Sequence, residues 1–288
     1  MKRMNFLALA LTSAAALSLI ACAPNTPQTQ KAETPAAAQP LTLAAAAAHP
    51  RRADNAARDK FRNPVKTLEF FGVQPSMTVG EVWPGWYTPL IAPYLASGGG
   101  EYVAILYQDS QGERAVARNT AFVEKYVGGE DMGNISIGGF GPDAAPMTAP
   151  NSLDVLLTFR NVHNWMGRGY ADKAFADFYA ALKPGGILGL VEHRLPESAT
   201  QDPKGRTGYV QESYMKDLAL RAGFEFVASS EVNANPRDTA DHPRGVWTLP
   251  PRSAVPKEGS DAAKDFDPAL YKNIGESDRA TLKFRKPL

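Results

Sequence analysis

The sequence predicts an α/β fold, in which a doubly wound, mostly parallel sheet of seven strands carries helices on both faces. Strand-like apolar segments alternate along the chain with segments of helical periodicity, and this alternation is typical of parallel sheets. The segment 152–159 is almost continuously apolar, as expected for a strand that is covered on both faces. Glycine turns or polar clusters follow several of these segments, where an open sheet would bind a ligand.

Each expected strand is bounded by turn residues or by a change of periodicity. The strands are expected at 77–83, 101–107, 135–140, 152–159, 187–191, 224–232 and 281–285. The last of them alternates polar and apolar residues, which suits a strand at the edge of the sheet.

Helices are expected to connect these strands. Their apolar residues recur at helical spacing, and glycines such as Gly72 and Gly223 stand where a helix would end. The turn Lys183-Pro-Gly-Gly186 is expected to end another helix in the same way. The expected helices span 64–71, 87–96, 120–126, 171–182 and 212–222.

The first residues have the pattern of a lipoprotein signal peptide. Lys2 and Arg3 precede an uncharged stretch at 6–20, and the following Leu19-Ile-Ala-Cys22 resembles the bacterial lipobox. We therefore expect cleavage of residues 1–21, lipid attachment at Cys22, and anchoring of the chain to a membrane of the cell envelope. The periplasmic face of the outer membrane is expected if the host is Gram-negative, and a cleaved signal with an incidental cysteine is the alternative. Cys22 is the only cysteine, which excludes an intramolecular disulfide and a catalytic cysteine in the mature domain.

The rest of the chain divides into a tether and one domain. Residues 22–57 are rich in Pro, Gln, Thr and Ala and are expected to form a disordered tether. Residues 58–288 have the length of one large domain, in which 233–278 are expected to form a lid-like insertion before the last strand. The 31 Lys and Arg balance the 30 Asp and Glu, so no nucleic-acid partner is predicted.

Motifs at five strand boundaries resemble those of a known enzyme family. Glu81 ends the first strand before a Gly loop, Leu182-Lys-Pro-Gly-Gly186 precedes the fifth strand, and Ala222-Gly-Phe224 precedes the sixth. In this order they resemble the class I S-adenosylmethionine-dependent methyltransferases. The segments Phe159-Arg-Asn-Val-His-Asn-Trp165 and Gly275-Glu-Ser-Asp-Arg279 resemble a narrower group of predicted bacterial methyltransferases with a Trp-Pro-Gly first loop.

The resemblance covers about residues 63–287 and implies a Rossmann-like fold, S-adenosylmethionine as cofactor and a small-molecule substrate. It implies that Glu81, Gly85 and Trp86 hold the amino-acid end of the cofactor. The family pattern is acidic-x-Gly-x-Gly-x-Gly. This chain departs from it with Glu81-Val-Trp-Pro-Gly-Trp-Tyr, which has one glycine of the three. Trp and Tyr would crowd such a site, so the alternative is a non-catalytic envelope protein that binds a small molecule.

A carboxylate after the second strand would bind the ribose hydroxyls of the cofactor, and Asp109 is the nearest one. Its Ser-Gln-Gly context is equally that of a β-turn.

The polar residues after the fourth strand are the catalytic candidates. Arg160 is expected to bind cofactor, and His163 is the best general base because its ordinary pKa lies near neutrality. Asn161 and His193 are further catalytic candidates, although Asn161 is equally a helix cap and either histidine equally structural. The histidines lack the sequence spacing of metal ligands, so no metal is predicted. A nicotinamide oxidoreductase is disfavoured, because no Gly-x-Gly-x-x-Gly follows the first strand.

Overall fold

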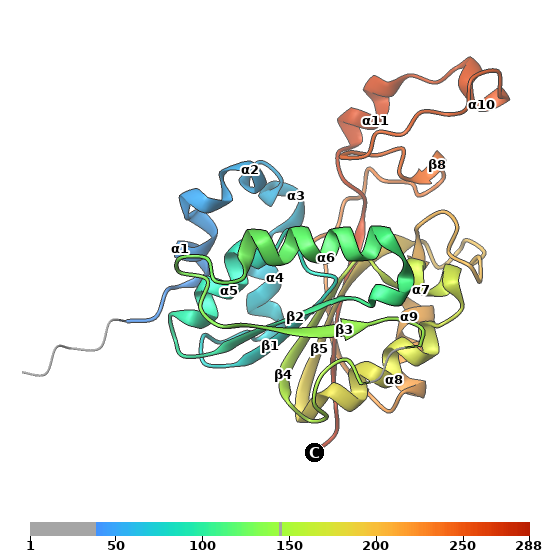
Figure 1. Cartoon of the computed structure of the whole chain (residues 1–288). Coiled ribbons are helices and arrows are strands. Elements are labelled where there is room, and N and C mark those ends of the chain that lie inside the picture. Colours follow the sequence, from blue (N-terminus) through green and yellow to red (C-terminus); the bar gives the residue numbers. More distant parts are fainter. Residues whose placement is uncertain (1–38, 144–145) are drawn as a thin grey trace, which may run out of the picture. The chain divides into compact units, whose positions relative to one another are not determined.

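The computed structural model describes residues 39–143 and 146–288, which contain one mixed α/β sheet (Figure 1). Seven strands follow the order β3-β2-β1-β4-β5-β9-β7, and the short β6 pairs with β5. The signal peptide and Cys22 lie outside the described residues. The strands are β1 (Thr78–Val82), β2 (Glu101–Tyr107), β3 (Ile135–Phe140), β4 (Leu153–Phe159), β5 (Leu182–Leu195), β6 (Val210–Gln211), β7 (Glu225–Ser230), β9 (Arg279–Arg285) and, off the sheet path, β8 (Pro243–Val246).

The mostly parallel, Rossmann-like sheet predicted from the sequence is confirmed. Strands β1 to β5 run parallel, and only β9 pairs antiparallel with its neighbours. The prediction that the last strand lies at an edge is wrong, because β9 lies between β5 and β7. Its alternation has another cause: Lys283 donates a hydrogen bond to the carbonyl of Phe70, and Arg285 pairs with Glu225, while the intervening residues are buried.

Helices cover both faces of the sheet, as predicted. The strands send alternate residues to two separate hydrophobic clusters: Leu156 of β4 joins one, and Val155 and Leu157 join the other. The first cluster packs against α7 (Val162–Arg168), α8 (Ala171–Ala181) and α9 (Glu212–Arg221). The second packs against α4 (Pro64–Phe71), α5 (Thr88–Ala96) and α6 (Glu113–Tyr126).

Several boundaries differ from the predicted ones, most of all those of α6 and β5. The helix expected at 120–126 begins earlier, at Glu113. The helix expected at 171–182 ends at Ala181, and β5 begins directly at Leu182, so that the Lys183–Gly186 turn belongs to the strand. Gly185 has a φ of 78°, which glycine adopts without a steric penalty, and the pairing of β4 with β5 shifts register at Leu153/Val155.

The prediction of a disordered tether up to residue 57 is wrong for residues 43–56. They form α1 (Leu43–Ala48), a 3₁₀ turn (Pro50–Arg52) and α2 (Ala53–Ala56), followed by α3 (Asp59–Arg62). Alanine is the strongest helix former, and the Thr42 side chain caps α1. Leu43 and Ala46 then bury themselves in the same cluster as α4 and α5, a tertiary contact that composition does not reveal.

Arg52 ties these N-terminal helices to one another. Its side chain is fully buried, donates two hydrogen bonds to Asp59 at 2.9 and 2.7 Å, and donates a third to the carbonyl of Ala47 at 2.6 Å. The guanidinium also lies over the ring of Trp86, 5.1 Å from its centroid.

The segment expected to be a lid-like insertion does connect β7 to β9, and it carries β8, α10 (Asp261–Lys264) and α11 (Pro268–Ile274) (Figure 1). Its two ends are tied together, because the backbone N–H of Asn235 donates to the Asp278 carboxylate at 2.8 Å and the Asn233 side-chain amide donates to the Thr281 hydroxyl at 3.0 Å. Within residues 39–143 and 146–288, no helix has the length and hydropathy needed to cross a membrane.

We expect Arg52→Ala to lower the free energy of unfolding by about 2 kcal/mol, because it removes several charge-assisted hydrogen bonds and leaves Asp59 without its partner. Urea denaturation measures this loss. The control is Arg114→Ala, an exposed arginine of α6, which should change stability little. Equal effects of the two substitutions would contradict the role of Arg52.

Candidate active site

The topology of the sheet creates a switch point between β1 and β4. From β1 the chain winds outward through β2 and β3, and it then returns to the other side of β1 with β4 and β5. In open α/β sheets ligands bind beyond the carboxyl ends of the strands at such a point. Here the Asn161 side chain, just after β4, donates to the carbonyl of Val82 at the end of β1, at 3.4 Å, and so bridges the two strand ends.

Two histidines and a glutamate lie together at the carboxyl ends of β4 and β5. The fully buried Glu192 carboxylate contacts Nδ1 of His163 at 3.1 Å and accepts the backbone N–H of His193 at 2.9 Å and that of His163 at 3.3 Å. Nδ1 of His193 makes a 2.5 Å hydrogen bond with the Ser277 hydroxyl. The two imidazole rings lie 5.7 Å apart.

This arrangement suits proton transfer. A carboxylate accepts hydrogen bonds only, so Glu192 requires the proton of a neutral His163 on Nδ1, which leaves Nε2 with a free lone pair. Burial lowers the pKa of His193 well below its usual value, and the interaction with His163 and the positive charges of Arg279, Arg160 and Arg62 lower it further. His193 is therefore neutral at physiological pH. The structure thus brings together the predicted His163 and His193 and adds Glu192 as the group that orients His163.

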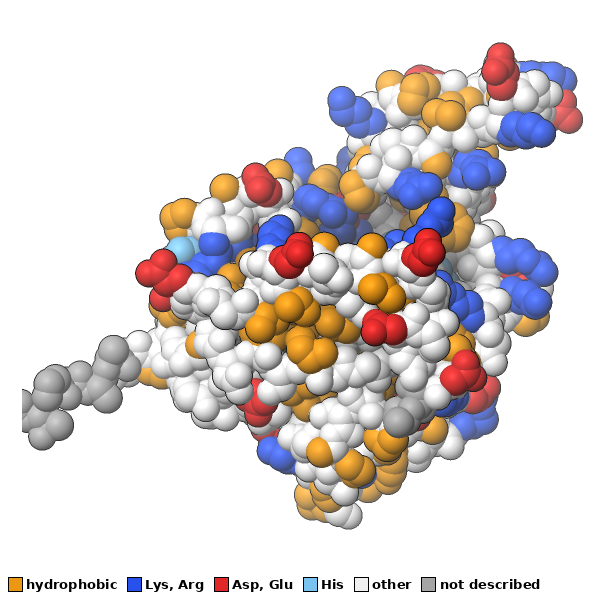
Figure 2. All heavy atoms as spheres, in the orientation of Figure 1, with side chains coloured by type: hydrophobic (Ala, Val, Ile, Leu, Met, Phe, Trp, Pro, Cys, Tyr) orange, Lys and Arg blue, Asp and Glu red, His pale blue; other side chains and the backbone are white. Residues whose placement is uncertain are grey.

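Beside His193 lies a second group, the arginine pocket, which we define by Arg58, Arg62, Arg160, Arg252, Glu276 and Arg279. It encloses about 230 Å³, and His193 and Ser277 also line it. The arginines come from the N-terminal helices, the end of β4, the insertion and the start of β9. Lys and Arg side chains gather on the surface where the N-terminal helices approach the insertion (Figure 2).

Glu276 holds three of these arginines. It accepts hydrogen bonds from Arg58 at 2.5 Å, from Arg62 at 3.2 Å and from Arg279. Burial acts to raise the pKa of Glu276, but the hydrogen bond from Arg58 and the charges of Arg279 and Arg62 outweigh it and lower that pKa to about 2. Glu276 is therefore ionised at every physiological pH.

The arginine pocket was missed by sequence reasoning, apart from Arg160. A signal was present, because the motif Gly275–Arg279 supplies Glu276, Ser277 and Arg279 together at the start of β9.

The predicted cofactor residues of the first loop lie in three different surroundings. Glu81 is 3% exposed and accepts a 2.6 Å hydrogen bond from the Tyr102 hydroxyl. Gly85 lines an apolar cavity of about 320 Å³ together with Tyr107, and a Cβ added at Gly85 would have no neighbour within 4 Å. Trp86 lies instead beneath Arg62, whose guanidinium is 4.6 Å from the ring centroid.

Trp83, which lies between Glu81 and Gly85 in the chain, packs against aromatic rings around the first loop. It has a φ of 51°, stacks on Tyr107 at 4.3 Å between ring centroids, and meets Trp165 edge-on at 5.9 Å. Trp83 occupies the position at which the acidic-x-Gly-x-Gly-x-Gly pattern has its first glycine.

Asp109 lies in an exposed 3₁₀ turn (Asp109–Gln111) and accepts a 3.0 Å hydrogen bond from Asn119. It lines a shallow depression beside β2 and β3 with Tyr107, away from the histidines and the arginine pocket. The turn geometry is the one expected from its Ser-Gln-Gly context.

Metal-ligand atoms of His163, Glu192 and His193 lie within 4.8 Å of one another, a proximity that the sequence spacing did not predict. However, Glu192 is already engaged with three hydrogen-bonding groups, the backbone N–H groups of His163 and His193 and Nδ1 of His163. The positive charges of the neighbouring Arg279, Arg160 and Arg62 also oppose a metal cation. The arrangement therefore favours proton transfer and the binding of anions.

No protein-family model and no curated protein matches the sequence. Solved structures match at a distance. A SAM-dependent methyltransferase from Aquifex aeolicus is 20% identical with a TM-score of 0.49, covering 64% of this chain and 90% of that one. The cyclase SpnF is 17% identical with a TM-score of 0.49, covering 79% and 80%.

A third structure, the Haemonchus contortus phosphoethanolamine N-methyltransferase 2 in complex with S-adenosyl-L-methionine, is 16% identical with a TM-score of 0.46, covering 79% of this chain and 53% of that one. At such identities and TM-scores these likenesses assign no activity to the chain, and one fold hosts unrelated chemistries.

The lowered pKa of Glu276 predicts a stability that acid removes. Its pKa is about 2 in the folded state against an ordinary 4.5, so the contribution is present above pH 4.5 and is lost as pH falls toward 2. By pH 3, about 2 kcal/mol should be lost. Urea denaturation from pH 7 to 3 should show Glu276→Gln to be less stable than wild type at pH 7, with a gap that narrows in acid. A gap that is constant with pH would contradict this assignment.

Glu81 predicts the opposite dependence. Burial raises its pKa to about 7, against the effects of Tyr102 and Arg160, so its contribution is present below pH 4.5 and is lost as pH rises through 7. The free energy of unfolding of Glu81→Gln minus that of wild type should therefore rise by about 2 kcal/mol from pH 5 to pH 8, measured by the same denaturation. A difference that does not rise with pH would contradict the raised pKa of Glu81.

Proposed function

We propose that this protein is an S-adenosylmethionine-dependent methyltransferase that acts on a small molecule. The observation that carries the proposal is the switch point, where the strand ends of the sheet bring the Gly85 loop, Asn161 and the His163–Glu192 pair to one edge. The order of the sequence motifs, which resembles that of class I methyltransferases, supports the same activity.

The residues of the first loop fit a cofactor in part. Gly85 has open space around its Cα and lines an apolar cavity together with Trp83 and Tyr107, so this cavity would hold S-adenosylmethionine. When bound, that cofactor supplies an electrophilic methyl group. Glu81 acts indirectly, since its buried carboxyl group fixes Tyr102 and interacts with the backbone of Gly85.

The chain's own residues then position the acceptor and remove its proton. Methyl transfer is a direct displacement, so alignment of the two reactants supplies much of the rate enhancement. His163, oriented through Nδ1 by Glu192, would take the proton of the acceptor on Nε2. The neutral His193 would accept a hydrogen bond from the acceptor at the neighbouring position.

We also propose that the protein is a lipoprotein of the cell envelope, attached through Cys22. The support is the basic, apolar and lipobox sequence of residues 1–22. Metabolic labelling with radioactive palmitate should mark the wild-type chain, and Cys22→Ser should abolish the label. Labelling that survives this substitution would exclude Cys22 as the acylated residue.

Calorimetric titration with S-adenosylmethionine and S-adenosylhomocysteine tests the activity class. Residues 39–288 are the appropriate sample, because α1 and Arg52 belong to the packed domain. Binding of both compounds would support the proposal and justify a screen for acceptors. No binding by a folded sample would replace it with the non-catalytic envelope protein.

We expect Gly85→Val to weaken binding of S-adenosylhomocysteine at least about tenfold, because its side chain would enter the space that the ligand needs. The added atoms meet no protein atom at Cβ, so the thermal unfolding temperature should stay close to that of wild type. Unchanged affinity in this variant would place the cofactor elsewhere.

We expect His163→Asn to abolish methyl transfer to an acceptor found in the screen while sparing cofactor binding. An asparagine amide can still donate to Glu192, but it has no nitrogen that accepts a proton. Turnover and calorimetry on the same sample separate the two effects. Retained turnover would remove the general-base role of His163.

A further inference from the structure

The arginine pocket carries a positive charge that the protein does not balance. Five arginines line it, whereas Glu276 is its one acidic residue. Burial, and to a smaller extent the charge of Arg160, lowers the pKa of Arg62 to about 8. Burial, and to a smaller extent the charge of Arg279, lowers the pKa of Arg160 to about 10. The protein thus holds like charges together at a cost in stability.

Two donors in this pocket are buried without an acceptor. Arg62 is 4% exposed and Arg279 is 2% exposed, yet Nη1 of Arg62 and Nε of Arg279 have no hydrogen-bond partner among the described residues. Arg160 makes no side-chain hydrogen bond to any residue of 39–143 or 146–288, and its backbone adopts a left-handed φ of 62°. Unpaired buried donors are costly, and arginine forks match the oxygens of carboxylates and phosphates.

The pocket lies beside the histidines, and its cavity is separate from the one that Gly85 lines. His193 lines it, and the His163 ring lies 5.7 Å from that of His193. Gly85 and Tyr107 line a different cavity, which shares no lining residue with the arginine pocket. An anion held by the arginines would therefore present the rest of its molecule to the proposed base.

We propose that the arginine pocket binds a carboxylate or phosphate group of the methyl acceptor. The acceptor is then an anionic small molecule, whose charged group occupies part of the 230 Å³ and whose nucleophilic atom faces His193 and His163. That the bound anion is the methyl acceptor rests on the proposed methyltransferase function. The existence of an anion site does not depend on that function.

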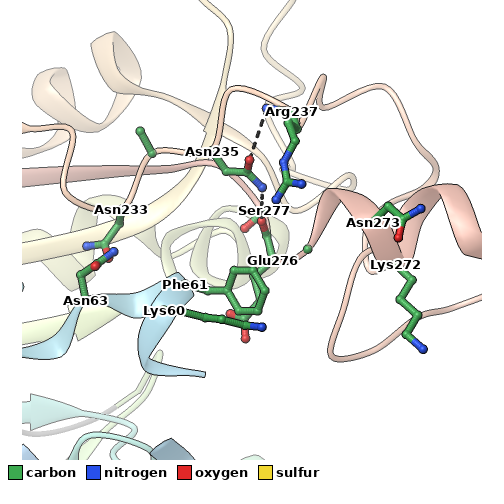
Figure 3. A pocket seen from close by; sticks show the side chains of 12 residues that line it. Lys60, Phe61, Asn63, Asn233, Asn235, Arg237, Lys272, Asn273, Glu276 and Ser277 are labelled. Carbon is green, nitrogen blue, oxygen red and sulfur yellow. Dashed lines mark hydrogen bonds between the residues drawn. The ribbon is translucent and has the colours of Figure 1, made fainter. Parts of the chain in front are cut away.

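The neighbouring cavity supplies a matched control. It encloses about 510 Å³ and shares Glu276 and Ser277 with the arginine pocket, and its other charged residues are Lys60, Arg237 and Lys272 (Figure 3). Arg237 is exposed and lines this cavity only, so Arg237→Gln removes a nearby positive charge without altering the arginine pocket.

The test uses the full-length chain and inorganic phosphate. Thermal unfolding is followed with increasing phosphate at constant ionic strength, against chloride. Wild type and Arg237→Gln should be stabilised equally by phosphate. Arg160→Gln should bind phosphate at least about tenfold more weakly, because it loses a charge-assisted hydrogen bond to the anion. Without phosphate, Arg160→Gln should unfold at or above the wild-type temperature, since repulsion is relieved and no hydrogen bond is lost.

A purely structural arginine would give the reverse, a less stable variant with an unchanged phosphate response, and this result would overturn the anion site. Equal loss of the response in both variants would do the same, because it would indicate general surface charge.

The anionic group in the pocket could belong to the methyl acceptor or to the cofactor, and titration of S-adenosylmethionine at saturating phosphate distinguishes the two. Unchanged cofactor affinity supports a pocket for the acceptor. Competition between phosphate and the cofactor would assign the pocket to the carboxylate of the cofactor and overturn the proposal. A phosphate response without any cofactor binding would refute the methyltransferase function and leave the anion site in place.

Discussion

The buried Glu276 carboxylate is the contact on which the arrangement of the site depends. It joins Arg58 and Arg62 from the N-terminal helices to Arg279 at the start of β9, so one side chain ties together segments more than 200 residues apart in sequence. The desolvation cost of these charges is offset by their mutual attraction and hydrogen bonds. The surplus of arginine over glutamate in this pocket is the basis of the anion site that we propose.

Two glutamates of this site show how surroundings decide the chemistry of one residue type. Glu276 is surrounded by guanidinium groups and stays ionised, whereas Glu81 is buried and accepts a hydrogen bond from the Tyr102 hydroxyl, and burial raises its pKa to about 7. The first acts as a fixed charge that organises the pocket. The second titrates near neutrality, so the first loop rests on a group whose charge depends on pH.

The parts of the structure that local pattern determines were predictable. β2 and β3 have the predicted bounds, because their apolar runs are enclosed by glycines and polar residues. The docking of α1 was missed because Leu43 and Ala46 bury little area alone, and only the cluster with α4 and α5 makes the segment ordered. The arginine pocket was missed for a related reason: a chain of nearly neutral net charge hides charges that only folding brings together. The position of β9 also escaped, since alternation reports the environment of a strand's two faces and not of its hydrogen-bonding edges.

The antiparallel β9 has a consequence for how such a protein can diversify. β7 ends and β9 begins at the edge of the sheet that carries the histidines, and the stem of the intervening excursion is closed by Asn235 with Asp278 and by Asn233 with Thr281. Beyond that stem, β8 packs against the loop after β5, where the Val246 N–H donates to the carbonyl of Thr207 and Val246 joins a cluster with Leu195 and Tyr209, whereas α10 and α11 bury none of their residues. Residues could be added to or removed from the stretch that carries α10 and α11 without shifting a strand of the sheet, so this stretch is where the chain could vary while the sheet and the histidine–glutamate group stay the same.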